Sequence, residues 1–350
     1  MKERQSNFEL VRILAILMIV SLHAFGFMDY TSLPANRLLG HVINAVGNTG
    51  VSLFILISGY FGVSFKPFRF VQLVFLTTFY TVAVHVALNG LAFDMGLLQA
   101  VLVVPMYHRW FVICYLALMV VSPWLNRFVN MMDKVEYRRL LLVLFVMFTV
   151  LPTLSGNSMH PIVTGTGKSF IYIIYIYMVG RYIRLHNDVD YRRRHTLGVA
   201  GVMTLIIVVL DVAGSIISGK QCLILVRDCS FLILISSVAL FYFFKSLRFR
   251  STAVNKISSC VLAVYLLDDM RPLVDRYVVG WMDKGDSPLF VFYLFAGVFA
   301  TFFIAVAIEM VRRFLLGNIE SRMVDATIRV SVKAWYKAAA FCQSRFHNFE

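Results

Sequence analysis

Apolar residues occur along this chain in long runs, and the first of them extends from Phe8 to Met28. Runs of about 20 apolar residues are long enough for an α-helix to cross a membrane. The first run is too long for the apolar core of a signal peptide, and no small-residue cleavage site follows it, so we interpret it as a retained helix. The pattern predicts an all-α polytopic membrane protein with about ten transmembrane helices. The expected spans are residues 8–28, 42–63, 70–90, 97–124, 139–155, 168–185, 197–217, 222–244, 257–279 and 288–311.

The fourth of these segments is irregular, because it contains Pro105 and the polar pair His108 and Arg109. We expect a short or re-entrant piece at 97–107, followed by a full helix that begins at Trp110. Irregular backbone at membrane depth is tolerated only where protein buries it or where it lines a cavity. The segment is therefore expected either to be buried in protein or to line a cavity.

Charge gives the expected orientation. The chain is 59% hydrophobic and only 15% charged, and its net charge is +14. With both termini in the cytoplasm, 25 of the 33 Lys and Arg residues lie at the cytoplasmic side and eight at the other side. This split follows the positive-inside rule. The basic surface then faces anionic lipid, so we expect membrane lipids and no nucleic acid as partners.

The pattern divides the chain into a transmembrane domain, residues 1–316, and a basic tail, residues 317–350. The tail alternates basic residues such as Arg322 and Lys333 with apolar residues such as Met323 and Trp335. That alternation is typical of an amphipathic helix lying on a membrane surface. We therefore expect the tail to lie on the cytoplasmic leaflet.

Arg12 and His23 are ionisable residues within the first apolar run. The step between them turns an α-helix through about 1100°, so both side chains share one face, roughly 16 Å apart along the axis. Ionisable residues inside a span mark a functional site by default. Histidine suits a general base, because its unperturbed pKa is about 6.5 and burial favours its neutral form. The alternative is a snorkelling arginine and a histidine that bonds a neighbouring helix.

The second span is rich in small and polar residues, among them Gly47, Asn48, Ser58 and Gly59. Small residues allow helix backbones to approach closely, which is one reading of this stretch. The other reading is that Asn48 and Ser58 line a polar cleft beside His23.

Two cations, Lys66 and Arg69, follow at the inner end of the second span. They suit phosphate groups, and they equally suit lipid headgroups and the topology rule. Trp110 presents an aromatic face for a carbohydrate ring, although tryptophan is also common at membrane interfaces. The sequence contains no GxSxG, Walker or HExxH motif and no metal-ligand spacing among its five cysteines, so we expect no permanently bound cofactor.

Together these features resemble the membrane-bound acyltransferase family 3, which includes O-acetyltransferases that decorate bacterial surface polysaccharides. The resemblance covers about residues 6–316. Four stretches carry it: NFELVRILAILMIVSLH with Arg12 and His23, VSLFILISGYF with Ser58 and Gly59, KPFR at 66–69, and HRWFVICYLALMVVSPWL. One departure is clear, because the family often has a histidine shortly after the tyrosine that corresponds to Tyr265, and this chain has Asp268 there.

The resemblance implies transfer of an acyl group, usually acetyl from acetyl-CoA, to a hydroxyl of a cell-surface polysaccharide or its lipid-linked precursor. It implies a location in the bacterial cytoplasmic membrane, with acyl-CoA as co-substrate. His23 would take the hydroxyl proton as general base, or would carry the acyl group transiently. The expected site residues are His23 and Arg12 for catalysis, Lys66 and Arg69 for the donor, and Asn48, Ser58, Trp110, Tyr265 and Asp268 for substrate.

Two other functions fit the pattern. The first is a transporter or flippase for a polysaccharide precursor, although the chain lacks the internal repeats and paired broken helices of many transporters. The second is an inactive family member that serves as a scaffold, an alternative that Asp268 leaves open. Formation of a sugar ester in purified membranes separates the enzyme from both.

Overall fold

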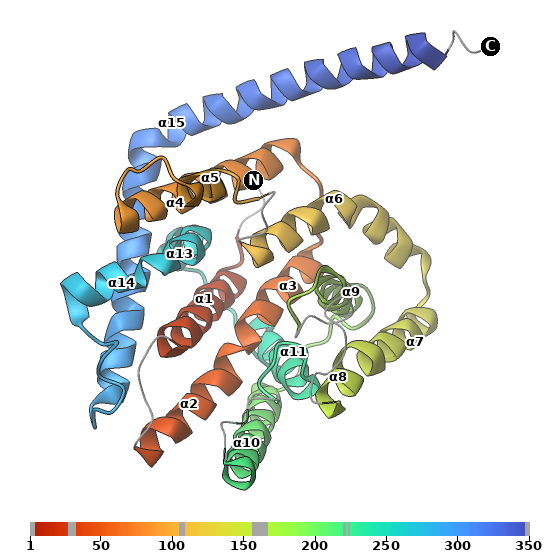
Figure 1. The fold of residues 1–350 in the computed structure, drawn as a ribbon. Helices are drawn as coiled ribbons and strands as arrows, with labels where there is room; N and C mark the ends of the chain where they lie inside the picture. The colour runs from red at the N-terminus through yellow and green to blue at the C-terminus, as the bar shows by residue number, and fades with distance from the viewer. Residues whose placement is uncertain are drawn as a thin grey trace.

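The computed structural model describes residues 4–26, 33–104, 109–155, 167–219, 222 and 225–346. These residues form helices and no strand. The first helix, α1 (Ser6–Gly26), lies near the centre of the bundle beside α3 (Thr49–Phe61) (Figure 1). Helix α2 (Pro34–Gly47) leads into α3 through Asn48. The apolar residues of the first run therefore form an inner helix.

Close backbone contact joins α3 to α9 (Phe170–His186). A Cβ atom added at Gly59 would lie 2.2 Å from the carbonyl oxygen of Tyr177, and one added at Gly180 would lie 2.5 Å from that of Leu56. Neither position has room for a side chain, so glycine is required for the two helices to pack at this distance. The packing interpretation of Gly59 is confirmed.

The irregular fourth segment forms the predicted short helix and the predicted full helix, on either side of residues 105–108. Helix α4 (Pro67–Asn89) is followed by the short α5 (Met95–Val101), and α6 (Trp110–Met131) begins at the expected tryptophan. Pro105 and His108 lie outside the described residues. Helix α7 (Lys134–Phe145) then continues through the π-turn η1 (Val146–Val150) into α8 (Leu151–Leu154).

Helix α10 (Arg193–Ser218) packs along α11 (Phe231–Lys245) at the edge of the bundle (Figure 1). The side-chain amide of Asn7 on α1 donates to the carbonyl oxygens of Phe244 and Lys245, at 3.2 and 3.3 Å. These are carbonyls of the last turn of α11, which have no partner within their own helix. The N-terminal end of α1 is thus fixed to the C-terminal end of α11.

The expected span 257–279 is not one helix. The chain forms α12 (Thr252–Ser258), α13 (Val261–Leu267), the 3-10 turn η3 (Asp268–Met270), α14 (Arg271–Val274) and the π-turn η4 (Asp275–Val279). Pro272 gives a physical reason, because proline lacks an N–H and its ring clashes with the carbonyl four residues earlier. That carbonyl belongs to Asp268, so the α-helix is interrupted at Asp268 and Asp269.

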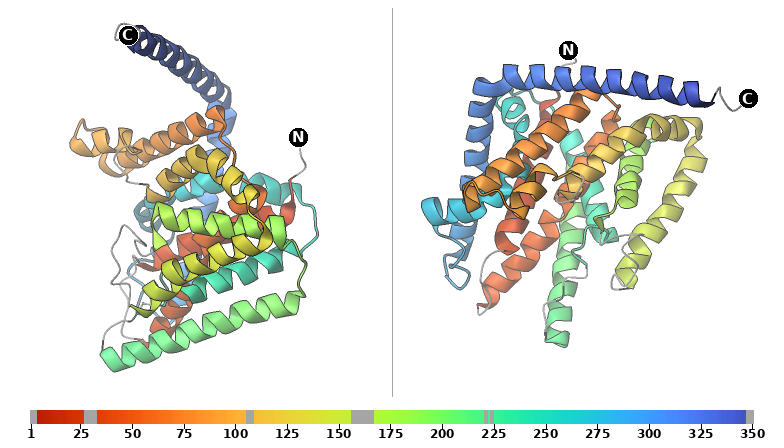
Figure 2. Two further views of the ribbon diagram at one scale, coloured as in Figure 1. Left: turned by 90° about the vertical axis from the view of Figure 1, so that its right-hand side faces the viewer. Right: turned by 45° about the horizontal axis from the view of Figure 1, so that its top comes forward.

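The C-terminal helix α15 extends from Phe290 to Phe346 without interruption, across the expected boundary at 316 and 317. Figures 1 and 2 show that it changes direction before its C-terminal part. An ion pair of 2.5 Å joins Arg312 to Glu320 on this helix. About 12 Å of rise separates such residues on a straight helix, so the pair requires a bend between them. The tail is helical as predicted, and its contact with a membrane surface stays a prediction.

Seven helical stretches among the described residues are long and apolar enough to cross a membrane. The expected count of ten is not confirmed. The three other expected spans correspond to α9 with 17 residues, α11 with 15 residues, and the interrupted segment from α12 to η4. The structure therefore supports a polytopic helical membrane protein, and the orientation of its termini stays a prediction.

Candidate active site

A cavity of about 520 Å³ lies among α1, α2, α3, α6, α12 and α13. Arg12 and His23 both line it, which confirms that they share one face of α1. Four other predicted site residues also line it, namely Asn48, Ser58, Trp110 and Tyr265. Lys66, Arg69 and Asp268 are not among its lining residues. The first helix thus contributes one ionisable side chain near each of its ends to a single cavity.

His23 forms a pair with Asp268. Its Nδ1 atom lies 2.5 Å from Oδ2 of that aspartate. A carboxylate only accepts hydrogen bonds, so it favours the tautomer that carries the proton on Nδ1 and leaves Nε2 free to take a proton. This pairing gives Asp268 a different place from the predicted one, since it contacts the histidine rather than the cavity. Asp268 is the first residue of the 3-10 turn that interrupts the helix, and its carboxylate contacts His23 on α1 from this position.

Burial differs sharply between the two partners. The side chain of His23 is 46% exposed, whereas that of Asp268 is 3% exposed. The histidine is therefore the accessible member of the pair and the aspartate the buried one. An exposed imidazole held by a buried carboxylate can exchange protons with a substrate while its orientation stays fixed.

Two arginines contact the consecutive aspartates Asp268 and Asp269. Arg271, whose side chain is 5% exposed, donates to Oδ2 of Asp268. Arg109, at the start of α6, forms an ion pair of 2.8 Å with Asp269 and donates to the carbonyl oxygen of Leu266 at 3.4 Å. Both arginines connect the interrupted segment to its surroundings. They act on the position of Asp268 and do not line the cavity.

At the other end of the cavity, Arg12 pairs with Glu9. Its Nη1 atom lies 2.7 Å from Oε1 of Glu9, and Oε2 of the same carboxylate accepts a hydrogen bond of 2.5 Å from Ser258. Glu9 thereby connects α1 to the end of α12. The Arg12 side chain remains 33% exposed, so its other donors are accessible to a ligand.

The two cations predicted for the donor lie apart from Arg12. Lys66 is the N-cap residue of α4, and Arg69 lies in its first turn. Both are exposed, and Arg69 donates to Gln72 at 3.2 Å. They form a basic surface at a helix N-terminus, which is a favourable place for an anion.

Three of the remaining predicted residues that line the cavity are Asn48, Ser58 and Tyr265. Asn48 donates through Nδ2 to the carbonyl oxygen of Asn44 at 2.8 Å, and Ser58 donates to that of Phe54 at 2.9 Å. These bonds use one donor of each side chain and leave acceptor capacity unused. The Tyr265 ring packs against Phe111, with centroids 5.7 Å apart. The cavity therefore has an aromatic wall and several polar acceptors.

Sequence reasoning missed two charged residues that line the cavity, Lys168 and Asp228. They lie just before α9 and just before α11, in two connecting segments. Asp228 falls inside the expected span 222–244, and an ionisable residue within a span was the signal that could have identified it. Lys168 stood at an expected span boundary and gave no comparable signal.

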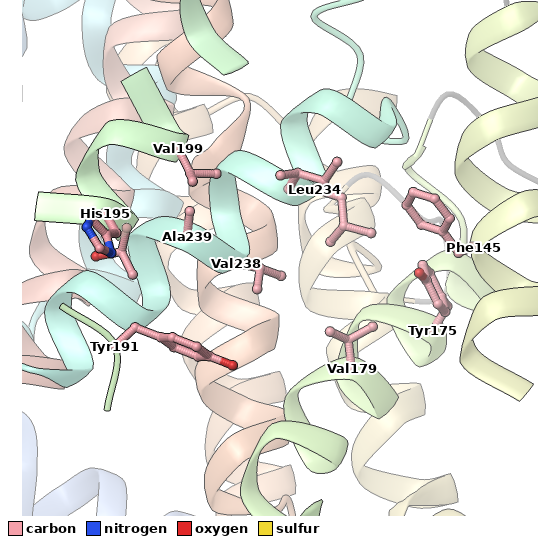
Figure 3. Close-up of a pocket in the computed structure, with 11 residues that line it drawn as sticks. Phe145, Tyr175, Val179, Tyr191, His195, Val199, Leu234, Val238 and Ala239 are labelled. Carbon is pink, nitrogen blue, oxygen red and sulfur yellow. The ribbon is translucent and has the colours of Figure 1, made fainter. Parts of the chain in front are cut away.

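A second hollow, of about 400 Å³, lies between α7, α9, α10 and α11. Figure 3 shows His195 and Tyr191 on one side of it and Tyr175 and Phe145 on the other. The side chains between them are aliphatic, among them Val179. This groove offers hydrocarbon surface and few polar partners, so we assign the chemistry to the first cavity.

The fold and the site define a polytopic helical membrane protein in which a histidine–aspartate pair faces a cavity. The family model for the acyltransferase domain matches residues 5–310. The chain belongs to this family, acyltransferase family 3, and the family indicates an acyltransferase. Comparison with curated proteins and with solved structures gives no significant match.

Proposed function

We propose that this protein transfers an acyl group, acetyl in the first instance, from acyl-CoA to a hydroxyl of a cell-surface polysaccharide or its lipid-linked precursor. It would act in the bacterial cytoplasmic membrane. The observation that carries the proposal is the His23–Asp268 pair at the wall of a cavity that also contains Arg12. A transporter needs no general base, whereas acyl transfer to a hydroxyl does.

The proposed reaction uses His23 as that base. The hydroxyl oxygen of the acceptor attacks the thioester carbonyl carbon, and Nε2 of His23 takes the hydroxyl proton. The new carbon–oxygen bond forms and the carbon–sulfur bond breaks. The proton then passes from the imidazolium to the departing CoA thiolate. Asp268 stabilises the imidazolium during these steps without itself becoming protonated.

The two ends of the cavity suit the two substrates. Arg12 lies roughly 16 Å from His23 along the helix axis. A CoA thioester is an extended, highly charged molecule, so its polar part would approach from the Arg12 end and its thioester would reach His23. Lys66 and Arg69 lie at the beginning of α4 and would attract its phosphates from the surface. The acceptor would enter from the other end, beside Trp110.

The test compares His23→Ala with His195→Ala, a histidine that lines the separate apolar groove. Each variant is expressed in cells that lack the parent protein, and membrane levels are matched by immunoblot. Ester-linked acyl groups on surface glycans are then measured by mass spectrometry. We expect His23→Ala to lose transfer by a factor of about 10²–10⁴ and His195→Ala to retain it. Near-normal acylation with His23→Ala would overturn the proposal.

A further inference from the structure

The carboxylate of Asp228 lies in the wall of the cavity, and the function proposed above gives it no role. The residue is only 6% exposed, and it lines the cavity together with His23. Among the described residues, no hydrogen-bond donor contacts its side chain. A carboxylate that faces a cavity and receives no hydrogen bond from the described residues can accept hydrogen bonds from a bound ligand.

The segment that carries Asp228 is fixed in position. The hydroxyl of Tyr172 donates to the Asp228 carbonyl oxygen at 2.8 Å. Gly167, which has a φ of +94°, lies against the same residue, and a Cβ atom added there would be 2.4 Å from the Asp228 Cβ. Glycine therefore permits both the backbone conformation and the close approach of the two segments. This contact brings Lys168, the next residue, beside Asp228.

Lys168 and Trp110 complete the group. The Lys168 ammonium lies 6.0 Å from the centroid of the Trp110 ring, and both residues line the cavity. The three side chains come from three segments: the start of α6, the residues before α9 and the residues before α11. They meet at the end of the cavity where His23 lies, away from Arg12.

The chemistry of this group matches a sugar ring. An aromatic face packs against the apolar C–H face of a pyranose, a carboxylate accepts from adjacent hydroxyls, and an ammonium donates to others. We propose that Asp228, Lys168 and Trp110 form the acceptor subsite, and that it takes a pyranose with two adjacent free hydroxyls that donate to Asp228. This inference rests on the proposed acyl transfer, since the hydroxyl beside His23 is the one that would be acylated.

Binding of the acceptor tests the proposal separately from catalysis. The probe is the surface glycan of the parent cells, freed of its ester groups by mild alkali. Its binding to the purified full-length protein in detergent is measured for the parent, Asp228→Asn, Lys168→Gln, His23→Ala and the control Asp283→Asn. Asp283 is exposed and pairs with Lys284 away from the cavity.

We expect the dissociation constant for the glycan to rise about 10- to 100-fold in Asp228→Asn and to rise in Lys168→Gln, with Asp283→Asn similar to the parent. In acetyl-transfer assays, Asp228→Asn should raise KM for the glycan while His23→Ala lowers kcat. Parent-like glycan binding by both subsite variants would overturn the subsite, as would a parent protein that binds no glycan. Loss of the proposed function would appear differently, as transfer that survives in His23→Ala.

Discussion

The Nδ1 atom of His23 lies 2.5 Å from Oδ2 of Asp268, although 245 positions of the chain separate the two residues. The contact joins the C-terminal part of α1 to the interruption between α13 and α14. It leaves Nε2 as the ring nitrogen that can take a proton.

Replacing Asp268 by Asn tests whether the carboxylate orients the histidine. An amide can donate as well as accept, so it stabilises the opposite tautomer, and kcat should fall by roughly 10²–10⁴-fold. The KM values for both substrates should change little. Thermal unfolding is measured in parallel, because the variant removes a carboxylate charge that pairs with the buried Arg271 side chain. A kcat equal to that of the parent would show that Asp268 only packs against the ring.

Arg12 should be the more demanding cation of the donor end. Its planar guanidinium binds phosphate or carbonyl oxygens through two bonds, which lysine cannot reproduce. We therefore expect Arg12→Lys to lose most activity and Lys66→Arg to be tolerated. Activity per amount of inserted protein is the measurement. Equal activities for the two variants would exclude a bidentate role for Arg12.

Removing the exposed cations of α4 should act on donor binding. Lys66→Ala and Arg69→Ala should raise the apparent KM for acyl-CoA with little change in kcat. Added salt should weaken donor binding by the parent protein and have less effect on the variants, because it screens exposed charges. If the variants change only protein level or orientation, these residues are topology signals.

Glycan binding should depend on pH through Asp228. Burial raises the pKa of this carboxyl from 3.8 to about 6, while the charges of Lys168 and His23 lower it. The carboxylate therefore becomes protonated as pH falls through about 6, and it then loses acceptor capacity. The test uses the His23→Ala background, because the charge of His23 acts on Asp228. In that background we expect binding to weaken from pH 7 to pH 5, and the weakening should disappear when Asp228→Asn is added. A pH dependence that persists would assign it to another group.

Cysteine labelling tests the predicted orientation. Single cysteines are introduced into a variant without the native ones, and intact cells are treated with a membrane-impermeant thiol reagent. Position 285 should react from outside, whereas position 190 should react only after the membrane is opened. The reverse pattern would invert the orientation and exchange the proposed entry sides of donor and acceptor.

The sequence by itself determined the helices and the shared face of Arg12 and His23. Both follow from local periodicity, because apolar run length and the turn per residue depend only on neighbours in the chain. The start of α6 at Trp110 was also local, since a proline and polar residues precede it. Three expected spans are not confirmed, because the structure makes them short or interrupted helices. Short or interrupted apolar helices such as α11 are tolerated at membrane depth where neighbouring helices bury them. Amino-acid composition does not show which segments are buried in this way.

Only the tertiary structure decided which groups accompany His23. Asp268 contacts the histidine, and Asp228 and Lys168 line the same cavity, although all three come from segments far along the chain from α1 and no spacing rule connects them to it. Their side chains meet because helix packing fixes where loops and helix interruptions come together. The shared face of Arg12 and His23 was thus predictable from α1 alone, whereas the residues that contact His23 or share its cavity were set by long-range contacts.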